Sequence, residues 1–256
     1  MARPPHIVSG QAGTGWLTRS IVVALLAWLA AAPLQAGQFN VSPVKVTLPA
    51  RAKATSVTIT NNGRKPLALR IRLYAWDKHE GEDRLQAAED LLVTPPILKL
   101  EPGRAQIVRI GRPAEIPVPA VEKAYRLVVS ELPLPGEGQA ESTLALRSLL
   151  EISVPVFVPP ARPDKRLEWT LQPGPQPAAA TVSVRNAGTV HSKLTRLRLL
   201  DAGGQLLAES QKMLYALPQQ QARTPLLLSR PLRTGETLKL EYTLDHAVRV
   251  IELKAP

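Results

Sequence analysis

The 256-residue sequence contains no cysteine, few aromatic residues and fewer acidic than basic side chains. Without cysteine, the chain has no disulfide framework, no thiolate metal site and no cysteine nucleophile. The formal net charge is +11, but lysine and arginine are scattered and never form a run of five. Because the aromatic residues are dispersed as well, the pattern favours a solvated basic surface over a nucleic-acid interface.

Sequence motifs for catalysis and cofactor binding are also missing. The chain has neither a nucleophile elbow nor a glycine-rich phosphate loop, and its histidines lie far apart. We interpret His191, which follows an Asn-Ala-Gly turn, as a structural residue. Glu80, Glu82 and Asp83 lack the ligand order of a calcium loop and are typical of a solvated hairpin tip. We therefore expect no enzyme, no cofactor and no metal ion.

The N-terminal segment, residues 1–36, has the features of a secretory signal peptide. Arg3 and Arg19 belong to a basic start without acidic residues. Residues 21–32 then form an apolar stretch of about twelve residues, too short to span a bilayer comfortably. Ala36 supplies a small side chain at the expected cleavage point, so the mature chain would begin near Gly37 and would not be inserted in a membrane. An uncleaved N-terminal anchor is the alternative.

Short segments with a two-residue period and frequent turn signals fill the rest of the chain. The expected strands cover residues 41–48, 54–60, 66–76, 91–100, 105–110, 125–132 and 144–158, and then 167–171, 180–185, 193–201, 205–209, 224–228, 237–244 and 248–253. A charged loop is expected at residues 79–83, and a stiff Pro-rich linker at residues 159–163. The sequence thus predicts an all-β protein with two immunoglobulin-like β-sandwich domains, residues 37–158 and a smaller one at 159–256.

The longest apolar segment, residues 144–158, reads with a period of two. One face carries Leu144, Leu146, Leu150, Ile152, Val154, Val156 and Val158, interrupted only by Ser148. Pro155 cannot donate a hydrogen bond to a neighbouring strand, which argues against a central position along the whole segment. A long apolar edge strand is prone to aggregation unless something covers it. We therefore predict that this strand completes the sheet of another chain.

Several blocks of the sequence resemble the periplasmic pilus chaperones of the chaperone–usher pathway. Residues 91–110, with a Pro-Pro pair and a Leu-Glu-Pro-Gly turn, resemble part of the first domain of that family. Residues 125–133 are similar to its penultimate strand, and residues 144–158 to its donor strand. The Asn-Ala-Gly turn at residues 186–188 is similar to the archaic, spore-coat-like branch.

This resemblance implies a non-catalytic periplasmic chaperone with its two domains in an L-shaped arrangement. In such complexes an edge strand fills the gap in a pilus or spore-coat-like subunit that lacks its own last strand. Basic residues between the domains hold the C-terminal carboxylate of the subunit, and the complex is passed to an outer-membrane usher. The same edge would allow free molecules to cap themselves by dimerising.

Particular residues follow from this resemblance. The donor residues are expected to be Leu144, Leu146, Leu150, Ile152 and Val154. Lys45 matches the first carboxylate-anchoring position of the family, whereas Ser153 or Pro155 replaces the lysine of the second. The alternatives for the second anchoring charge are Arg109, Arg126 and Arg147. The alternative function is a secreted structural or adhesive fibre subunit, although that would predict a single incomplete sandwich with a spare N-terminal strand.

Overall fold

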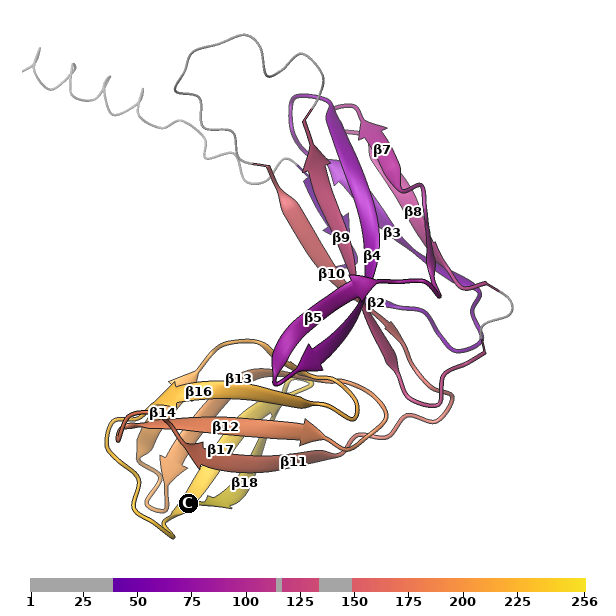
Figure 1. Cartoon of the computed structure of the whole chain (residues 1–256). Helices are drawn as coiled ribbons and strands as arrows, with labels where there is room; N and C mark the ends of the chain where they lie inside the picture. Colours follow the sequence, from indigo (N-terminus) through magenta and orange to yellow (C-terminus); the bar gives the residue numbers. More distant parts are fainter. Residues whose placement is uncertain (1–38, 114–116, 134–148) are drawn as a thin grey trace, which may run out of the picture. The chain divides into compact units, whose positions relative to one another are not determined.

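The structure is a computed structural model that describes residues 39–113, 117–133 and 149–256 (Figure 1). These residues form eighteen strands, contain no α-helix and belong to one compact unit. Among them, no helix is long and apolar enough to cross a lipid bilayer. The predicted all-β class is confirmed, whereas the predicted signal peptide at residues 1–36 lies outside the described residues.

The first ten strands form the N-terminal sandwich. They are β1 (Phe39–Ser42), β2 (Val46–Thr47), β3 (Ala54–Asn61), β4 (Leu67–His79), β5 (Glu82–Ala87), β6 (Leu92–Thr94), β7 (Ile97–Leu100), β8 (Ala105–Gly111), β9 (Lys123–Leu132) and β10 (Glu151–Val158). One sheet has the order β1-β3-β8-β6, and the other has the order β2-β10-β9-β4-β5, with β7 also paired to β4. Alternate side chains such as Ile59, Val108, Leu69 and Leu127 are fully buried in the core. Burying each of them contributes about 1.5–3 kcal/mol.

The N-terminal end of this sandwich differs from the prediction. The prediction of a single strand at residues 41–48 is wrong, because the chain leaves one sheet after β1 and enters the other at β2. β1 pairs with β3, whereas β2 pairs with the end of β10. Pro43, which has no N–H to donate, lies directly after β1 and ends that pairing. Val44 and Lys45 bridge the two strands and are exposed.

The charged loop expected at residues 79–83 is instead the tip of a tight hairpin. β4 and β5 pair up to His79 and Glu82, which leaves only Glu80 and Gly81 in the turn. Both turn residues have positive φ angles, 52° and 88°, as a two-residue hairpin turn of this hand requires. Every residue of β5 is exposed. The strand therefore lacks the alternation of apolar and polar residues by which it could have been predicted.

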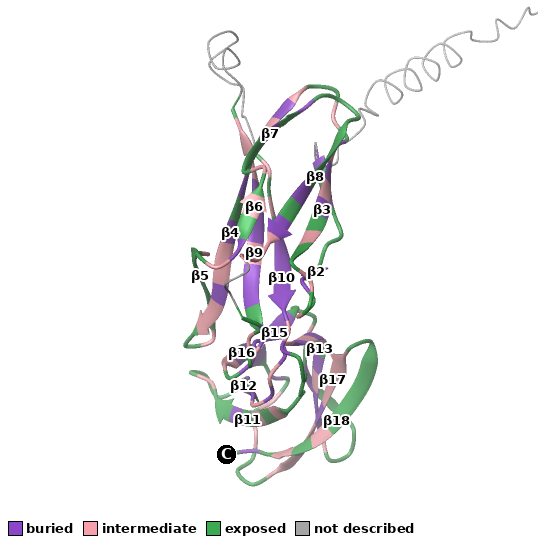
Figure 2. Ribbon diagram, turned by 90° about the vertical axis from the view of Figure 1, so that its right-hand side faces the viewer, coloured by how far each residue is buried: buried purple, intermediate pink, exposed green. Residues whose placement is uncertain are grey.

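The remaining strands form the C-terminal sandwich, with a separate core (Figure 2). They are β11 (Leu167–Pro173), β12 (Ala179–Asn186), β13 (Ser192–Asp201), β14 (Leu206–Ser210), β15 (Leu214–Ala216), β16 (Gln221–Leu227), β17 (Thr237–Leu244) and β18 (Ala247–Lys254). One sheet has the order β11-β12-β16, and the other has the order β14-β13-β17-β18, with β15 also paired to β13. β15 was missed by the sequence analysis, because three residues are too short to show a period.

Each sandwich contains a buried asparagine with the same pattern of hydrogen bonds to the backbone. The Asn61 amide donates to the carbonyl of Leu100 at 2.9 Å, and its oxygen accepts a backbone N–H two residues later. The Asn186 amide donates in the same way to the carbonyl of Ala216 at 2.8 Å, and its oxygen accepts from the N–H of Gly188 at 2.9 Å. A Cβ atom at Gly188 would lie 2.4 Å from a backbone oxygen, so this turn requires glycine. The buried amides thus fix one turn in each sandwich.

Candidate functional site

The strand β10 has one complete neighbour and one partial neighbour. It pairs antiparallel with β9 along its whole length, from Glu151 to Val158. On its other side β2 pairs only with Val156 and Phe157, and the N–H of Leu48 donates to the carbonyl of Phe157 at 2.8 Å. Within the described parts of the chain, no strand pairs with β10 before Val156 on that side. The N-terminal half of β10 is therefore an open sheet edge among these residues.

The hydrogen bonds of β10 show which backbone groups face this open edge. In an antiparallel ladder, the N–H and C=O groups of every second residue point to the same neighbour. The carbonyl of Leu150 accepts from the N–H of Glu131 in β9 at 2.9 Å, and the carbonyl of Phe157 faces the opposite side. The residues whose backbone groups point away from β9 are therefore Glu151, Ser153 and Pro155. Proline is tolerated at 155 because its missing N–H removes no bond to β9.

The apolar side chains of β10 divide between the core and the open edge. Val154 and Val156 are 2% and 0% exposed and pack inside the N-terminal sandwich. Leu150 and Ile152 are partly buried against the same core. Leu149, just before the strand, is 48% exposed. The apolar surface available beside the open edge is thus concentrated in residues 149–152.

A hollow of about 390 Å³ lies beside this edge. It is lined by Ser153 and Pro155 of β10, by the β4–β5 hairpin and by residues of the C-terminal sandwich. Its cationic lining residues are Lys78, Arg126, Lys193, Lys212 and Arg223, and its carboxylates are those of Glu82 and Asp83. A concave surface with this excess of one charge attracts anions.

Arg126 occupies a partly desolvated position in the hollow. Its guanidinium carbon lies 3.7 Å from the centre of the Trp76 ring and 5.6 Å from that of Tyr215, and its side chain is only 18% exposed. Burial lowers the pKa of Arg126, whereas the charge of Asp83, 4.0 Å away, acts in the opposite direction. A guanidinium held over an aromatic ring keeps its fork of donors available for a carboxylate.

Asp83 is the internal carboxylate closest to Arg126 in this lining. It accepts a hydrogen bond from Lys78 Nζ at 2.6 Å, and the Lys78 side chain is only 6% exposed. Burial would raise the pKa of Asp83, but the hydrogen bond from Lys78 and nearby positive charge outweigh it, so the pKa is lowered. The carboxylate is therefore ionised at neutral pH and already balances the charge of Lys78, one of the five cations of the hollow.

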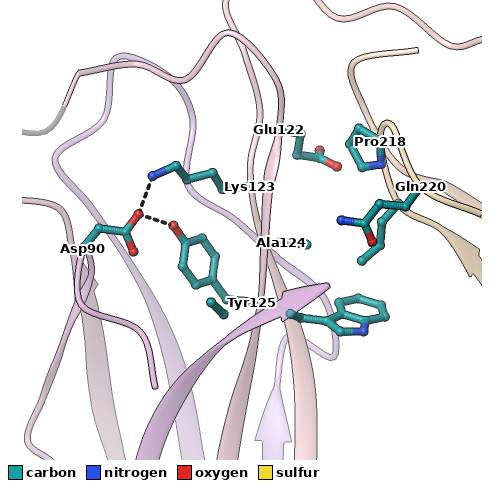
Figure 3. Close-up of a pocket in the computed structure, with 10 residues that line it drawn as sticks. Asp90, Glu122, Lys123, Ala124, Tyr125, Pro218 and Gln220 are labelled. Carbon is teal, nitrogen blue, oxygen red and sulfur yellow. Dashed lines mark hydrogen bonds and ion pairs between the residues drawn. The ribbon is translucent and has the colours of Figure 1, made fainter. Parts of the chain in front are cut away.

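A second hollow, of about 300 Å³, has one cation, Lys123, and two carboxylates, Asp90 and Glu122, in its lining (Figure 3). The Asp90 carboxylate accepts from Lys123 Nζ at 2.6 Å and from the Tyr125 hydroxyl at 2.7 Å, as the dashed lines in Figure 3 show. Its other acidic lining residue, Glu122, is engaged by His191. This hollow therefore lacks the positive surplus charge that distinguishes the one beside β10.

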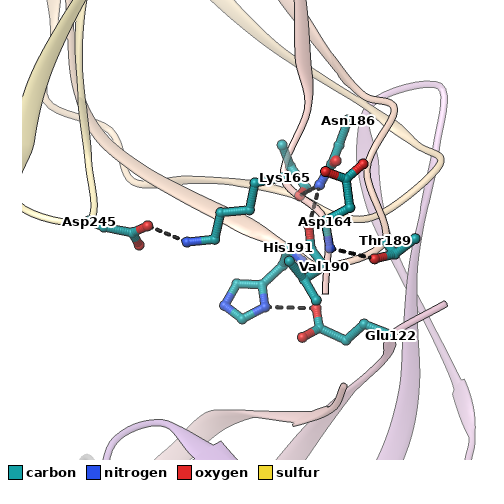
Figure 4. Close-up of polar contacts among 9 residues, drawn as sticks. Glu122, Asp164, Lys165, Asn186, Thr189, Val190, His191 and Asp245 are labelled. Atoms are coloured by element: carbon teal, nitrogen blue, oxygen red, sulfur yellow. Dashed lines mark hydrogen bonds and ion pairs between the residues drawn. The ribbon is translucent and has the colours of Figure 1, made fainter. Parts of the chain in front are cut away.

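The end of β10 is tied to the C-terminal sandwich. Phe157 stacks on the His191 ring with centroids 3.6 Å apart, and it belongs to a buried cluster with Trp76, Tyr215 and Leu217. The Glu122 carboxylate accepts from the backbone N–H of His191 and contacts its Nδ1, both at 2.7 Å (Figure 4). His191 thus has a packing and hydrogen-bonding role, and these contacts fix one end of the strand whose other half is open.

The sequence matches a known family over the N-terminal sandwich and the linker. Residues 38–164 fit the family described as pili and flagellar-assembly chaperone, PapD N-terminal domain. The chain belongs to this family of pilus-assembly chaperones. Its members are non-enzymatic, and the protein is accordingly a chaperone and not an enzyme. Chaperones of the chaperone–usher pathway are periplasmic. No curated protein matches the chain by sequence.

Solved structures of pilus chaperones share the fold. The CsuC–CsuE chaperone–tip adhesion subunit pre-assembly complex, from the archaic Csu pili of Acinetobacter baumannii, matches with a TM-score of 0.62 and 18% identity, covering 84% of this chain and 98% of that one. The YadV chaperone matches with a TM-score of 0.58 and 16% identity, covering 86% of this chain and 100% of that one. The complex of the Salmonella enterica SafA pilin with the SafB chaperone matches with a TM-score of 0.57 and 18% identity, covering 86% of this chain and 98% of that one. The two immunoglobulin-like sandwiches predicted from the sequence are thereby confirmed.

The predicted donor residues have different places in this pilus-assembly chaperone. Leu144 and Leu146 lie outside the described residues, and the regular strand begins only at Glu151. Leu150 and Ile152 lie beside the open edge. Val154 differs from the expectation, because its side chain fills the protein's own core and is not available to a partner. The two-residue period correctly placed these side chains on one face, but it could not tell which chain covers that face.

The predicted anchoring residues also lie in different parts of the structure. Arg126 lines the hollow beside β10, whereas Arg147 lies outside the described residues. Arg109 is exposed on β8, in the sheet that does not contain β10. Lys45 is exposed and does not line the hollow, although its neighbour Val44 does. Lys165 lowers the pKa of Asp245 by a hydrogen bond (Figure 4), and the charge of Lys45 adds to this effect.

Several cations of the hollow were missed by the sequence analysis. Lys78, Lys193, Lys212 and Arg223 come from separate elements, the first from β4 and the others from the C-terminal sandwich. They lie far apart in the sequence and form no motif. Only the contact between the two sandwiches brings them to the edge of β10.

Proposed function

We propose that this protein is a periplasmic chaperone that stabilises pilus-type subunits by donor-strand complementation and delivers them to an outer-membrane usher. Residues 1–36 would act as the export signal, and residues 37–158 and 159–256 as the two domains. The open edge of β10 carries the proposal, because an unpaired edge with apolar side chains needs a cover. A subunit that lacks one strand is such a cover. The Asn-Ala-Gly turn at residues 186–188 favours a subunit of the archaic, spore-coat-like type.

The geometry of the edge sets the form of the complex. The outward N–H and C=O groups of Glu151 and Ser153 would pair with a subunit strand, and Leu149, Leu150 and Ile152 would bury apolar surface against it. Each such side chain contributes about 1.5–3 kcal/mol when it becomes fully buried. Association and side-chain ordering offset several kcal/mol of this gain. The resulting complex would hold a subunit and still allow another strand to replace the chaperone. A second copy of the protein could cover the same edge in the absence of subunits.

The hollow beside the edge would hold the C-terminal carboxylate of the subunit. We assign Arg126 as the anchoring cation, because it lines the hollow next to Ser153 and Pro155 and is partly desolvated over Trp76. A bidentate contact from its guanidinium to a carboxylate would fix the register of the added strand. Lys45 and Arg109 are less suitable, because neither lines this hollow.

The proposal is tested by Ser153→Pro with Ser153→Ala as its matched control. Proline removes the one N–H of residue 153, which points away from β9, and so leaves the β9–β10 ladder intact. Alanine removes the hydroxyl and keeps the N–H. The measurement is the yield of one-to-one complex when the chaperone is co-expressed in the periplasm with a pilus-type subunit from the same bacterium.

We expect Ser153→Pro to lose most of the complex while its thermal midpoint stays near that of the wild type, and Ser153→Ala to keep the complex. Should Ser153→Pro unfold the protein, Glu151→Pro provides the same test at the other outward position. Normal complex yield from a folded proline variant would contradict the use of this edge.

A further inference from the structure

The hollow beside β10 carries more positive charge than one carboxylate can balance. Five cationic residues face two carboxylates, which leaves a surplus of three positive charges (5 − 2 = 3). Asp83 is already engaged by Lys78. Among the described residues, Lys193, Lys212 and Arg223 form no ion pair. A single C-terminal carboxylate at Arg126 would therefore leave at least two cations of the hollow without a counter-charge.

The lysines are better placed than Arg223 to meet a further negative charge. The aliphatic part of the Arg223 side chain packs against the hairpin tip, where a Cβ atom at Gly81 would lie 3.1 Å from its Cγ. Its guanidinium also donates to Gln221 at 3.2 Å. Lys193 lies on β13 opposite Tyr215, and Lys212 precedes β15, so both border the same side of the hollow as the Tyr215 ring near Arg126.

The same hollow also offers apolar contact. Val44 and Met213 are 80% and 52% exposed, and both belong to its lining together with Leu214 and Pro155. A bound segment would thus bury apolar side chains on these residues while its charges face the lysines. This mixture fits an extended peptide terminus better than a small inorganic anion.

Building on the proposed function, we propose that this hollow selects subunits whose C-terminal segment carries an acidic side chain in addition to its free carboxylate. Arg126 would receive the carboxylate, and Lys193 and Lys212 would act as the specificity-determining residues for the acidic side chain. Several like charges in one concavity raise the local potential, so a second negative charge on the ligand gains more there than on an open surface.

The test uses the complete mature chain and short synthetic peptides that end in an apolar residue with a free carboxylate. One peptide carries Asp two residues before the end, and its partner carries Asn at that position. Competition fluorescence anisotropy at low salt compares their affinities for the wild type and for Lys193→Gln/Lys212→Gln. The control, Arg64→Gln/Lys65→Gln, removes two exposed charges from the β3–β4 connection, which does not line the hollow.

We expect the Asp peptide to bind about three- to tenfold more tightly than the Asn peptide, as two charge pairs near the surface would give. The double lysine variant should lose this preference, and the control should keep it. Equal affinities for the two peptides in the wild type, or an equal loss in the control, would overturn the inference. If that happens while Ser153→Pro still abolishes subunit capture, the proposed function stands and only the selection of acidic termini fails.

Discussion

At the scale of single residues, the balance around Arg126 governs the hollow. Its guanidinium lies over the Trp76 ring and 4.0 Å from the carboxylate of Asp83, which is also bound to Lys78. Asp83 is thus an internal carboxylate in a site that would receive an external one. The internal charge weakens the attraction of the hollow for an anion, because it neutralises Lys78 and lies beside the anchoring cation.

Replacing Asp83 by Asn should therefore strengthen the binding of a peptide with a free C-terminal carboxylate. We expect a gain of roughly two- to fivefold at low salt, because one negative charge disappears and Lys78 becomes available. Fluorescence anisotropy with the Asn peptide described above measures the change. Glu168→Gln, which removes an exposed carboxylate that pairs with Arg185 and does not line the hollow, is the control and should leave the affinity unchanged. A weaker affinity in Asp83→Asn would show that the carboxylate supports the site instead.

A second residue-scale prediction concerns stability and pH. Burial would raise the pKa of Asp90, but hydrogen bonds from Lys123 and Tyr125 outweigh it, so the pKa is lowered in the folded state. A carboxyl group with a lowered folded-state pKa stabilises the fold above its unfolded value of about 3.9, and this contribution disappears as the pH falls through the folded-state pKa. Asp90→Asn should therefore be less stable at pH 7 and should lose less stability on acidification.

The free energy of unfolding measured in urea between about pH 7 and pH 2 tests this. The curves for the wild type and Asp90→Asn should converge at the acidic end. Parallel curves over the whole range would contradict the role of Asp90, because the pH dependence would then come from other groups.

At the scale of elements, the sequence was most informative where apolar residues alternate. β3 and β17 were predicted within two residues of their observed ends, because their buried positions follow the period of a sheet. β5 was missed for the opposite reason, since all its residues are exposed. Its place is set by the two-residue turn before it and by pairing with β4.

The strand β10 shows what a period can and cannot predict. Pro155 correctly indicated an incomplete ladder, and the structure places this proline where its missing N–H faces away from β9. The pairing of Val156 and Phe157 with β2 could not be foreseen, because it depends on the chain passing from one sheet to the other after Ser42. The cationic hollow was equally out of reach, because Lys193 and Lys212 meet Arg126 only after both sandwiches have folded.

At the scale of the whole molecule, the contacts between the sandwiches hold one end of β10 in place. Phe157 packs against His191, Trp76 and Tyr215, and the backbone N–H of Lys78 donates to the side chain of Gln220 at 2.6 Å. These contacts join the β4–β5 hairpin, the end of β10 and the C-terminal sandwich. The chaperone can thus present an open edge and a cationic hollow side by side without a partner to organise them.

The most direct measurement is residue-resolved amide hydrogen exchange on the chaperone, alone at low concentration and bound to a subunit. The account predicts that the amides of Glu151 and Ser153, which point away from β9, exchange fast in the free chain and become protected in the complex. The amides of Ile152 and Val154, which face β9, should be protected in both states. Protection of the Ser153 amide in the free monomer, or continued fast exchange in the complex, would contradict the claim that a subunit strand pairs with this edge.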